Sequence, residues 1–149
     1  MKNIKLLNKI AAVGTDVFCK DCYVCGEDIV ISFTPVLVPM NRGILATIYA
    51  TLKDGVTEAD IAAAYEKMYG DEYFIRLSEA GTLPESKWVK GSNFVDIGFK
   101  VDERTNRVIA ISSLDNLVKG AAGQALQNMN IMFGLDEKTG LDQVTPFPV

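Results

Sequence analysis

Two stretches of the chain alternate between apolar and polar residues with a period of two, as the strands of a half-buried sheet do. The first covers residues 44–52, and one face of it carries Ile44, Ala46, Ile48, Ala50 and Leu52. The second covers residues 93–101, and one face of it carries Val95, Ile97, Phe99 and Val101. Both stretches are rich in β-branched and aromatic residues, which favours strands over helices.

The second stretch is followed by a hairpin signal. Asp102–Asn106 is polar, and Asn106 tolerates a positive φ, so the chain is expected to turn there and return antiparallel over residues 108–113. Two weaker strands are predicted over residues 28–34 and 73–77, the former buried on much of both faces. The segments 35–43 and 78–91 are predicted to be loops because prolines and glycines interrupt them.

One amphipathic helix is predicted after Thr57. Thr57 and Asp60 form a variant of the capping box, in which each side chain bonds the backbone N–H of the other residue. The helix is expected to end at Gly70, and its apolar stripe consists of Ile61, Ala64, Tyr65 and Met68.

A second helix is predicted over residues 114–134, with Asp115 as its cap and Gly134 closing it in the left-handed conformation. Its apolar stripe consists of Val118, Ala122, Ala125, Met129 and Met132. Gly120 and Gly123 inside a helix cost about 1 kcal/mol each relative to alanine. We interpret them as sites of close approach, either by a sheet, which the pattern favours, or by a ligand.

The order of elements, with strands and helices mixed and one hairpin, predicts an α+β domain: an antiparallel or mixed sheet with helices packed on one face. A length of 149 residues fits one domain. The net charge of −4 argues against nucleic acid or an anionic membrane as a partner. No apolar run approaches the ~18 residues of a membrane span, and the start lacks a signal-peptide pattern, so we expect a cytoplasmic protein. The 48% apolar content predicts that some surface closes against another chain or domain.

Three cysteines, Cys19, Cys22 and Cys25, are spaced so that their thiolates can meet at one metal ion. A structural zinc site needs four ligands, and the sequence contains no further cysteine and no histidine. Free reduced thiols are therefore the favoured interpretation, and no metal site is predicted. A metal-binding module remains an alternative that metal analysis of the purified chain would test.

Several long strings resemble one family. They are Ser32–Pro35, Leu37–Leu45, Lys87–Asn93, Asp102–Thr105 and Asp115–Gly134. Residues 26–149 resemble the C-terminal dimerisation domain of N-acetyl-gamma-glutamyl-phosphate reductases, the NADP-dependent semialdehyde dehydrogenases of arginine biosynthesis, whereas residues 1–25 match poorly. The resemblance implies a glyceraldehyde-3-phosphate-dehydrogenase-like C-terminal domain that carries the dimer contacts and one wall of the active site.

The resemblance does not extend to the family's reactive groups. No G-x-G-x-x-G string is present, so a dinucleotide-binding domain has no counterpart in the sequence. The family's catalytic cysteine and histidine are not matched, and Val36 stands where the family usually has histidine. A thiol nucleophile and a histidine base carry this chemistry, so we predict no catalytic residue here and no activity of the chain alone.

Binding residues can be assigned from side-chain chemistry and, for Asn116, from the resemblance. Arg42, with Asn41 beside it, is a candidate to hold the phosphate or carboxylate of a small-molecule substrate, and the alternative for Arg42 is a surface salt bridge. By the resemblance, Asn116 is expected to face the nicotinamide amide of NADP, and the alternative is an ordinary residue at the start of the helix. Gly120, on the cofactor side, and Gly123 would let the helix lie against the dinucleotide-binding domain, which is a packing role. The expected partners are a second copy of the chain and a separate dinucleotide-binding domain.

The sequence therefore supports two functions. The first is the C-terminal domain of an N-acetyl-gamma-glutamyl-phosphate reductase that works beside a dinucleotide-binding half. The second is a non-catalytic paralogue kept for dimerisation or regulation, which the missing histidine favours.

Overall fold

A computed structural model of the protein describes residues 32–79 and 81–143. The chain divides into two units, Met1–Val38 and Pro39–Val149. Of the first unit, the described residues 32–38 are exposed and lie in no helix or strand. The strand predicted over residues 28–34 is therefore wrong for residues 32–34, because they pair with no other strand. Residues 28–31 and the three cysteines lie outside the described part of the chain.

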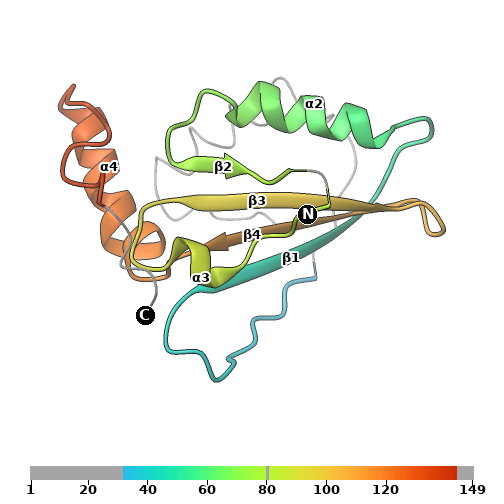
Figure 1. Cartoon of the computed structure of the whole chain (residues 1–149), viewed down its shortest axis with the longest axis horizontal. Coiled ribbons are helices and arrows are strands. Elements are labelled where there is room, and N and C mark those ends of the chain that lie inside the picture. Colours follow the sequence, from blue (N-terminus) through green and yellow to red (C-terminus); the bar gives the residue numbers. More distant parts are fainter. Residues whose placement is uncertain (1–31, 80, 144–149) are drawn as a thin grey trace, which may run out of the picture. The chain divides into compact units, whose positions relative to one another are not determined.

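The second unit is built on a four-stranded sheet with the order β1-β4-β3-β2 (Figure 1). The strands are β1 (Ile44–Thr51), β2 (Ile75–Leu77), β3 (Val95–Asp102) and β4 (Arg107–Leu114). β4 pairs antiparallel with both β1 and β3, while β2 pairs parallel with β3. The sheet is mixed, as the sequence predicted.

The β3–β4 hairpin turns at Asn106, which has a φ of 50° and whose side-chain amide donates to Leu52 O at 3.0 Å. Val101 lies opposite Val108, and Val95 lies opposite Leu114. This register places Val95, Ile97 and Phe99 on one face of the sheet and Asp96 on the other. The hairpin, the positive φ of Asn106 and the alternation of side chains along β3 confirm the predictions made from the sequence.

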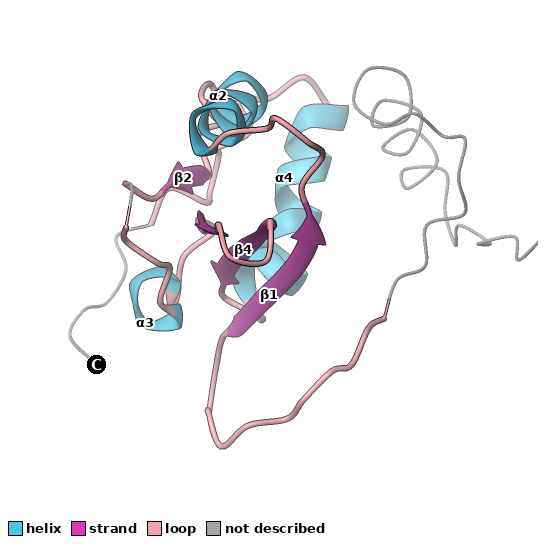
Figure 2. Ribbon diagram, turned by 90° about the vertical axis from the view of Figure 1, so that its right-hand side faces the viewer, coloured by secondary structure: helices cyan, strands magenta, loops and turns pink. Residues whose placement is uncertain are grey.

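The helix α2 (Glu58–Tyr69) lies over the face that carries Phe99 (Figures 1 and 2). Its Tyr65 ring stacks on the Phe99 ring with centroids 5.5 Å apart. The helix begins at the predicted capping box, in which Thr57 N donates to Asp60 Oδ2 at 2.9 Å and Asp60 N donates to Thr57 Oγ1 at 3.3 Å. Both bonds of the predicted capping box form, so the predicted start of the helix is confirmed.

A short helix, α3 (Ser86–Val89), lies within the segment predicted to be a loop. Arg76, whose guanidinium holds Asp96 on the opposite face of the sheet, also donates to Trp88 O at 3.2 Å. Val89 is fully buried. One helical turn is too short to produce a readable period, so the sequence did not reveal it.

The helix predicted over residues 114–134 is not continuous. A π-helical turn, η1 (Val118–Ala122), precedes α4 (Gly123–Met132), and Gly134 closes the segment with a φ of 69°. The predicted apolar stripe is wrong: of its five residues only Val118 is half-buried and the rest are exposed, while Gly123 and Asn130 are buried. Polar bonds hold the inner face instead, since Asn130 Nδ2 donates to Thr139 O at 2.9 Å and to Glu137 O at 3.2 Å.

The hydrophobic core of the described residues is small, and its buried members are Phe74, Val89, Val95 and Leu141. Many large apolar side chains are exposed instead. On β1 they are Ile44, Leu45, Ile48 and Tyr49, and at the end of α4 they are Met129, Ile131, Met132, Phe133 and Leu135. None of the helices in residues 32–79 and 81–143 is long and apolar enough to cross a bilayer.

Candidate functional site

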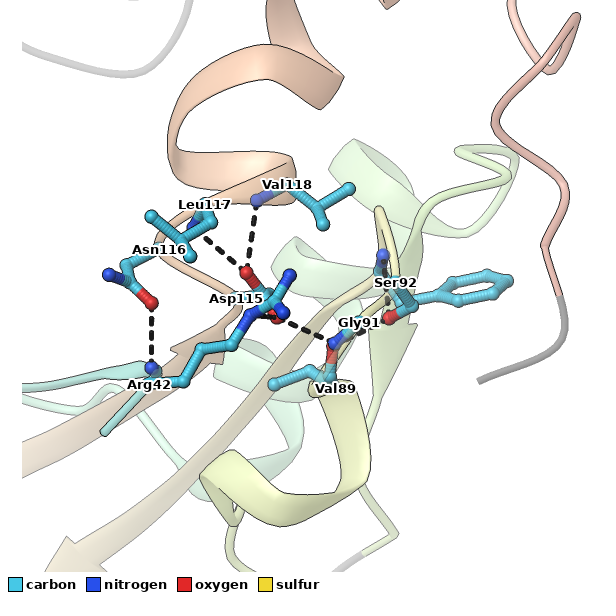
Figure 3. A network of polar contacts seen from close by, with 10 residues as sticks. Arg42, Val89, Gly91, Ser92, Asp115, Asn116, Leu117 and Val118 are labelled. Atoms are coloured by element: carbon cyan, nitrogen blue, oxygen red, sulfur yellow. Dashed lines mark hydrogen bonds and ion pairs between the residues drawn. The ribbon is translucent and has the colours of Figure 1, made fainter. Parts of the chain in front are cut away.

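The candidate site lies where β4 ends, at the completely buried residue Asp115 (Figure 3). Its carboxylate accepts hydrogen bonds from Gly91 N at 2.6 Å, Leu117 N at 2.8 Å and Val118 N at 2.9 Å. The last two bonds satisfy the free N–H groups at the start of η1, which is the role of a helix cap. The bond to Gly91 also ties the turn after α3 to the same carboxylate.

Arg42 reaches the same carboxylate from the loop before β1. Its Nε lies 2.7 Å from Asp115 Oδ2, and 31% of the Arg42 side chain is exposed. Nη1 and Nη2 of Arg42 make no hydrogen bond to the described residues. The ion pair predicted as the alternative role of Arg42 therefore exists, but its partner is a buried carboxylate and not a surface one.

The charge of Asp115 is stabilised by these contacts. Burial favours the protonated acid, but the three backbone hydrogen bonds and the contact with Arg42 outweigh it. The pKa of Asp115 therefore lies below its ordinary value of 3.8. The carboxylate is ionised at neutral pH, and the guanidinium beside it is its only cationic contact in the described residues.

Asn116 lies beside this pair. Its Oδ1 accepts a hydrogen bond from Gly43 N at 2.8 Å (Figure 3). Gly43 has a φ of 112°, and a Cβ there would lie 3.0 Å from Ser86 Cβ, so both the backbone and the space require glycine. With Oδ1 occupied, the Nδ2 amide of Asn116 is left as the donor of this side chain.

Of the other residues assigned by resemblance, Asn41 is exposed in the same loop as Arg42. Gly120 lies in η1, and its N–H donates to Asp115 O at 2.8 Å. The fold thus gathers Arg42, Asn116 and Gly120 around one residue, Asp115. The sequence pattern indicated Asp115 only as a helix cap, and it did not indicate Gly91, for which the glycine itself was the one signal; its φ in the structure is 78°.

A polar layer under η1 and α4 fixes the helix to the sheet. Asn93 Nδ2 donates to Gln127 Oε1 at 3.0 Å, and Lys119 Nζ donates to the same oxygen at 2.7 Å. Gln127 Nε2 donates to Glu137 Oε2 at 2.8 Å. Burial lowers the pKa of Lys119, and the negative charges of Glu137 and Glu72 oppose that shift. These bonds tie the start of the helix to the residues before β3, while Asn93 Oδ1 is buried without a hydrogen-bond partner in the described residues.

The corner formed by Arg42 and Asn116 presents hydrogen-bond donors to solvent. Guanidinium nitrogens bind tetrahedral and planar anions, and a primary amide donates to a carbonyl oxygen. The corner therefore suits a ligand with an anionic group and a neighbouring carbonyl. No group of three or more metal-ligating side chains occurs among residues 32–79 and 81–143.

Comparison with known proteins shows which family the chain is similar to. A family model for the semialdehyde dehydrogenase dimerisation domain matches residues 20–116. An N-acetyl-gamma-glutamyl-phosphate reductase from Lachnospira eligens is 59% identical over 127 residues, which are 85% of this chain and 36% of that relative. A protein of the same name from Lachnoclostridium phytofermentans is 57% identical over 122 residues, which are 82% of this chain and 35% of that relative. The chain spans about a third of the length of these curated relatives.

A solved structure shares the fold. It is aspartate semialdehyde dehydrogenase II from Vibrio cholerae, with a TM-score of 0.52 and 20% identity. The match covers 65% of this chain and 29% of that one. This similarity supports the predicted fold class, a glyceraldehyde-3-phosphate-dehydrogenase-like domain with a mixed sheet.

Proposed function

The chain belongs to the semialdehyde dehydrogenase dimerisation-domain family, and from this premise we propose that it is the C-terminal part of an N-acetyl-gamma-glutamyl-phosphate reductase. The observation that carries the proposal is the identity of 57–59% to proteins of that name over more than four fifths of the chain. The proposed reaction is the NADP-dependent reduction of an acyl phosphate to a semialdehyde, in the cytoplasm. The hydride comes from NADPH, which is the chemistry that this cofactor supplies when bound.

The residues at the candidate site support a binding role in this reaction. We assign Arg42, with Asn41 beside it, to the anionic group of the substrate, because Nη1 and Nη2 make no hydrogen bond to the described residues and a guanidinium can bind two oxygens at once. We assign Asn116 to the nicotinamide carboxamide. Its fixed Oδ1 leaves Nδ2 to donate to the carboxamide oxygen, so the residue fits that group. We assign Gly120, an exposed residue of η1, to the cofactor side of the site.

Turnover is proposed to need a second polypeptide segment. The chain covers about a third of its relatives, and it contains no histidine to serve as the base that the reaction uses. We propose that this chain works together with a dinucleotide-binding domain equivalent to the part of the relatives that it does not match. Mixing the chain with that part of the Lachnospira eligens relative and assaying NADP reduction tests the proposal.

Membership of a dimerisation-domain family supports a homo-oligomer. We propose that β1 contributes to the contact between copies. β1 is an edge strand of eight residues without charge or proline, and Leu45, Ile48 and Tyr49 on it are 52%, 57% and 65% exposed. An edge of this kind is normally covered in a native protein.

A non-catalytic paralogue that serves dimerisation or regulation is the second candidate. The absence of histidine from the 149 residues and the presence of Val36 favour it. The same mixing experiment separates the two candidates, because a paralogue of this kind would fold and dimerise without restoring activity.

A further inference from the structure

We propose that Asp115 is a positioning residue, which sets Arg42 and Asn116 side by side as one unit that donates hydrogen bonds to an anionic substrate group and to the cofactor. The inference rests on the proposed function of Arg42 and Asn116, and it adds the residue that holds them and the coupling between them.

Three segments that are distant in sequence meet at Asp115. They are the loop before β1, through Arg42; the turn after α3, through Gly91; and the start of η1, through Leu117 and Val118. The carboxylate is completely buried and both of its oxygens are engaged, so it has one orientation. Each segment is therefore fixed relative to the other two by a single side chain (Figure 3).

The ion pair with Asp115 restricts the orientation of the Arg42 side chain. Asp115 Oδ2 forms an ion pair with the inner nitrogen, Nε, which is buried, while 31% of the Arg42 side chain stays exposed. A free arginine loses much rotamer freedom when it binds a ligand, and an arginine already anchored at Nε loses less. The ion pair therefore lowers the conformational entropy that the Arg42 guanidinium loses when it binds an anion.

Asn116 is coupled to the same unit through two neighbours. It follows Asp115 in the sequence, and its Oδ1 is held by Gly43, which follows Arg42. A movement of the Arg42 loop therefore moves the acceptor bond of Asn116 as well. Binding of an anion at Arg42 is expected to be felt at Asn116 Nδ2, which joins the substrate side of the site to the cofactor side.

Positioning and simple charge make opposite predictions for Asp115. A negative carboxylate 2.7 Å from Arg42 Nε opposes the attraction of Arg42 for an anion. If charge were the whole effect, removal of the carboxylate would strengthen anion binding. If Asp115 positions the guanidinium, its removal weakens binding in spite of the lost repulsion.

The test uses inorganic phosphate as the probe and the full 149-residue chain. Phosphate is titrated into wild type and Asp115→Asn while the nuclear magnetic resonance signals of Arg42 Nε–H and Asn116 Nδ2–H are followed. Asparagine keeps the oxygen that caps η1 and loses the oxygen that accepts from Gly91 and pairs with Arg42. We expect phosphate to bind Asp115→Asn about tenfold more weakly and the Asn116 signal to stop responding to phosphate.

Glu85→Gln is the matched control. Glu85 pairs with Lys87, and their side chains are 49% and 56% exposed, respectively. The substitution removes one negative charge from this exposed pair, so phosphate affinity should change by less than about twofold. Arg42→Lys is the second variant, used if Asp115→Asn does not fold. It keeps the positive charge and lacks the Nε that Asp115 holds, and it should lose the response at Asn116.

The outcomes separate this inference from the proposed function. Equal or tighter phosphate binding by Asp115→Asn, or an unchanged Asn116 response in Arg42→Lys, overturns the positioning role alone. Failure of wild type to bind phosphate overturns the assignment of Arg42 as an anion ligand, and the positioning role falls with it.

Discussion

The backbone N–H of Gly43 donates to the side-chain oxygen of Asn116 at 2.8 Å, although the two residues are 73 positions apart in the sequence. This bond joins the loop before β1 to the end of β4. It fixes the oxygen of Asn116, and the amide hydrogens on Nδ2 are the donors that this side chain offers a ligand. The cofactor role proposed for Asn116 depends on this division of its two ends.

Asn116→Asp keeps the acceptor oxygen of the side chain and removes its amide donor. The carboxylate still accepts from Gly43, so the chain should fold as wild type does, but it cannot donate to a carboxamide oxygen. In an enzyme reconstituted with the missing part of a relative, we expect the KM for NADP to rise about tenfold or more. Steady-state kinetics measure it.

Asn116→Ala is the companion variant. It should lose the donor and also the bond to Gly43, with a cost of about 1 kcal/mol in the free energy of unfolding. A KM for NADP that is unchanged in Asn116→Asp would contradict the cofactor role.

Asp115→Asn should destabilise the chain by about 2–4 kcal/mol at neutral pH, because Gly91 loses its hydrogen-bond acceptor and Arg42 loses its ion-pair partner in a buried place. Urea unfolding measures this free energy. Glu85→Gln, at an exposed ion pair, should change it by no more than about 0.5 kcal/mol.

The same variant carries a pH signature. The pKa of Asp115 is lower in the folded chain than its ordinary value of 3.8, so the unfolded chain takes up this proton first as the pH falls. The stabilisation is fully present above the unfolded pKa and is lost as the pH falls through the folded pKa. The difference in free energy between wild type and Asp115→Asn should therefore shrink below about pH 4. A difference that stays constant down to acid pH would show that the charge of Asp115 contributes nothing.

Gly123→Ala should destabilise the chain although alanine is the better helix former. A Cβ at Gly123 would collide with Asn93 Oδ1 and lie 2.7 Å from Val118 O. Alanine gains about 1 kcal/mol of helix propensity, and the collision should leave a net loss of about 2 kcal/mol or more. Thermal and urea unfolding measure it.

Gly120→Ala is the internal comparison. Its Cβ would lie 3.2 Å from Leu114 Cδ1, at the end of a side chain that can shift, and 3.3 Å from Asp115 O. We expect a change within about 1 kcal/mol of wild type. Equal effects of the two substitutions would contradict the close approach of Asn93 to the helix.

Tyr49→Glu should weaken the association of two chains by about tenfold or more, because a charge would be placed in the proposed contact on β1. Sedimentation equilibrium measures the dissociation constant. Leu83→Glu, on a side chain that is 39% exposed outside β1, is the control and should leave association unchanged. Equal association of wild type and Tyr49→Glu would remove β1 from the interface.

The sequence predicted the elements whose pattern is long and local. The alternation around Ile97 and Phe99 set the facing of β3, the reciprocal bonds of Thr57 and Asp60 started α2, and Asn106 turned the hairpin. Each of these signals is complete within a few neighbouring residues, so no knowledge of the tertiary structure was needed.

The errors at η1 and α4 have a shared cause, which is that tertiary contacts overrode a local pattern. The stripe from Val118 to Met132 satisfies the helical period, yet Asn93, Gln127 and Asn130 turn the polar side of α4 inward. The extra residue in the π-turn at η1 shifts the period as well. Neither effect is readable in one sequence. The joint role of Arg42, Gly91 and Asp115 was hidden for the same reason, since their contacts span up to 73 positions.

The most direct test of the proposed function is an activity measurement on a mixture. The purified chain is combined with the part of the Lachnospira eligens relative that it does not match, and phosphate-dependent reduction of NADP by N-acetylglutamate semialdehyde is followed by absorbance. We predict no turnover by either component alone and turnover on mixing. Turnover by the 149-residue chain alone, or none from a mixture in which both parts are folded, would contradict the account.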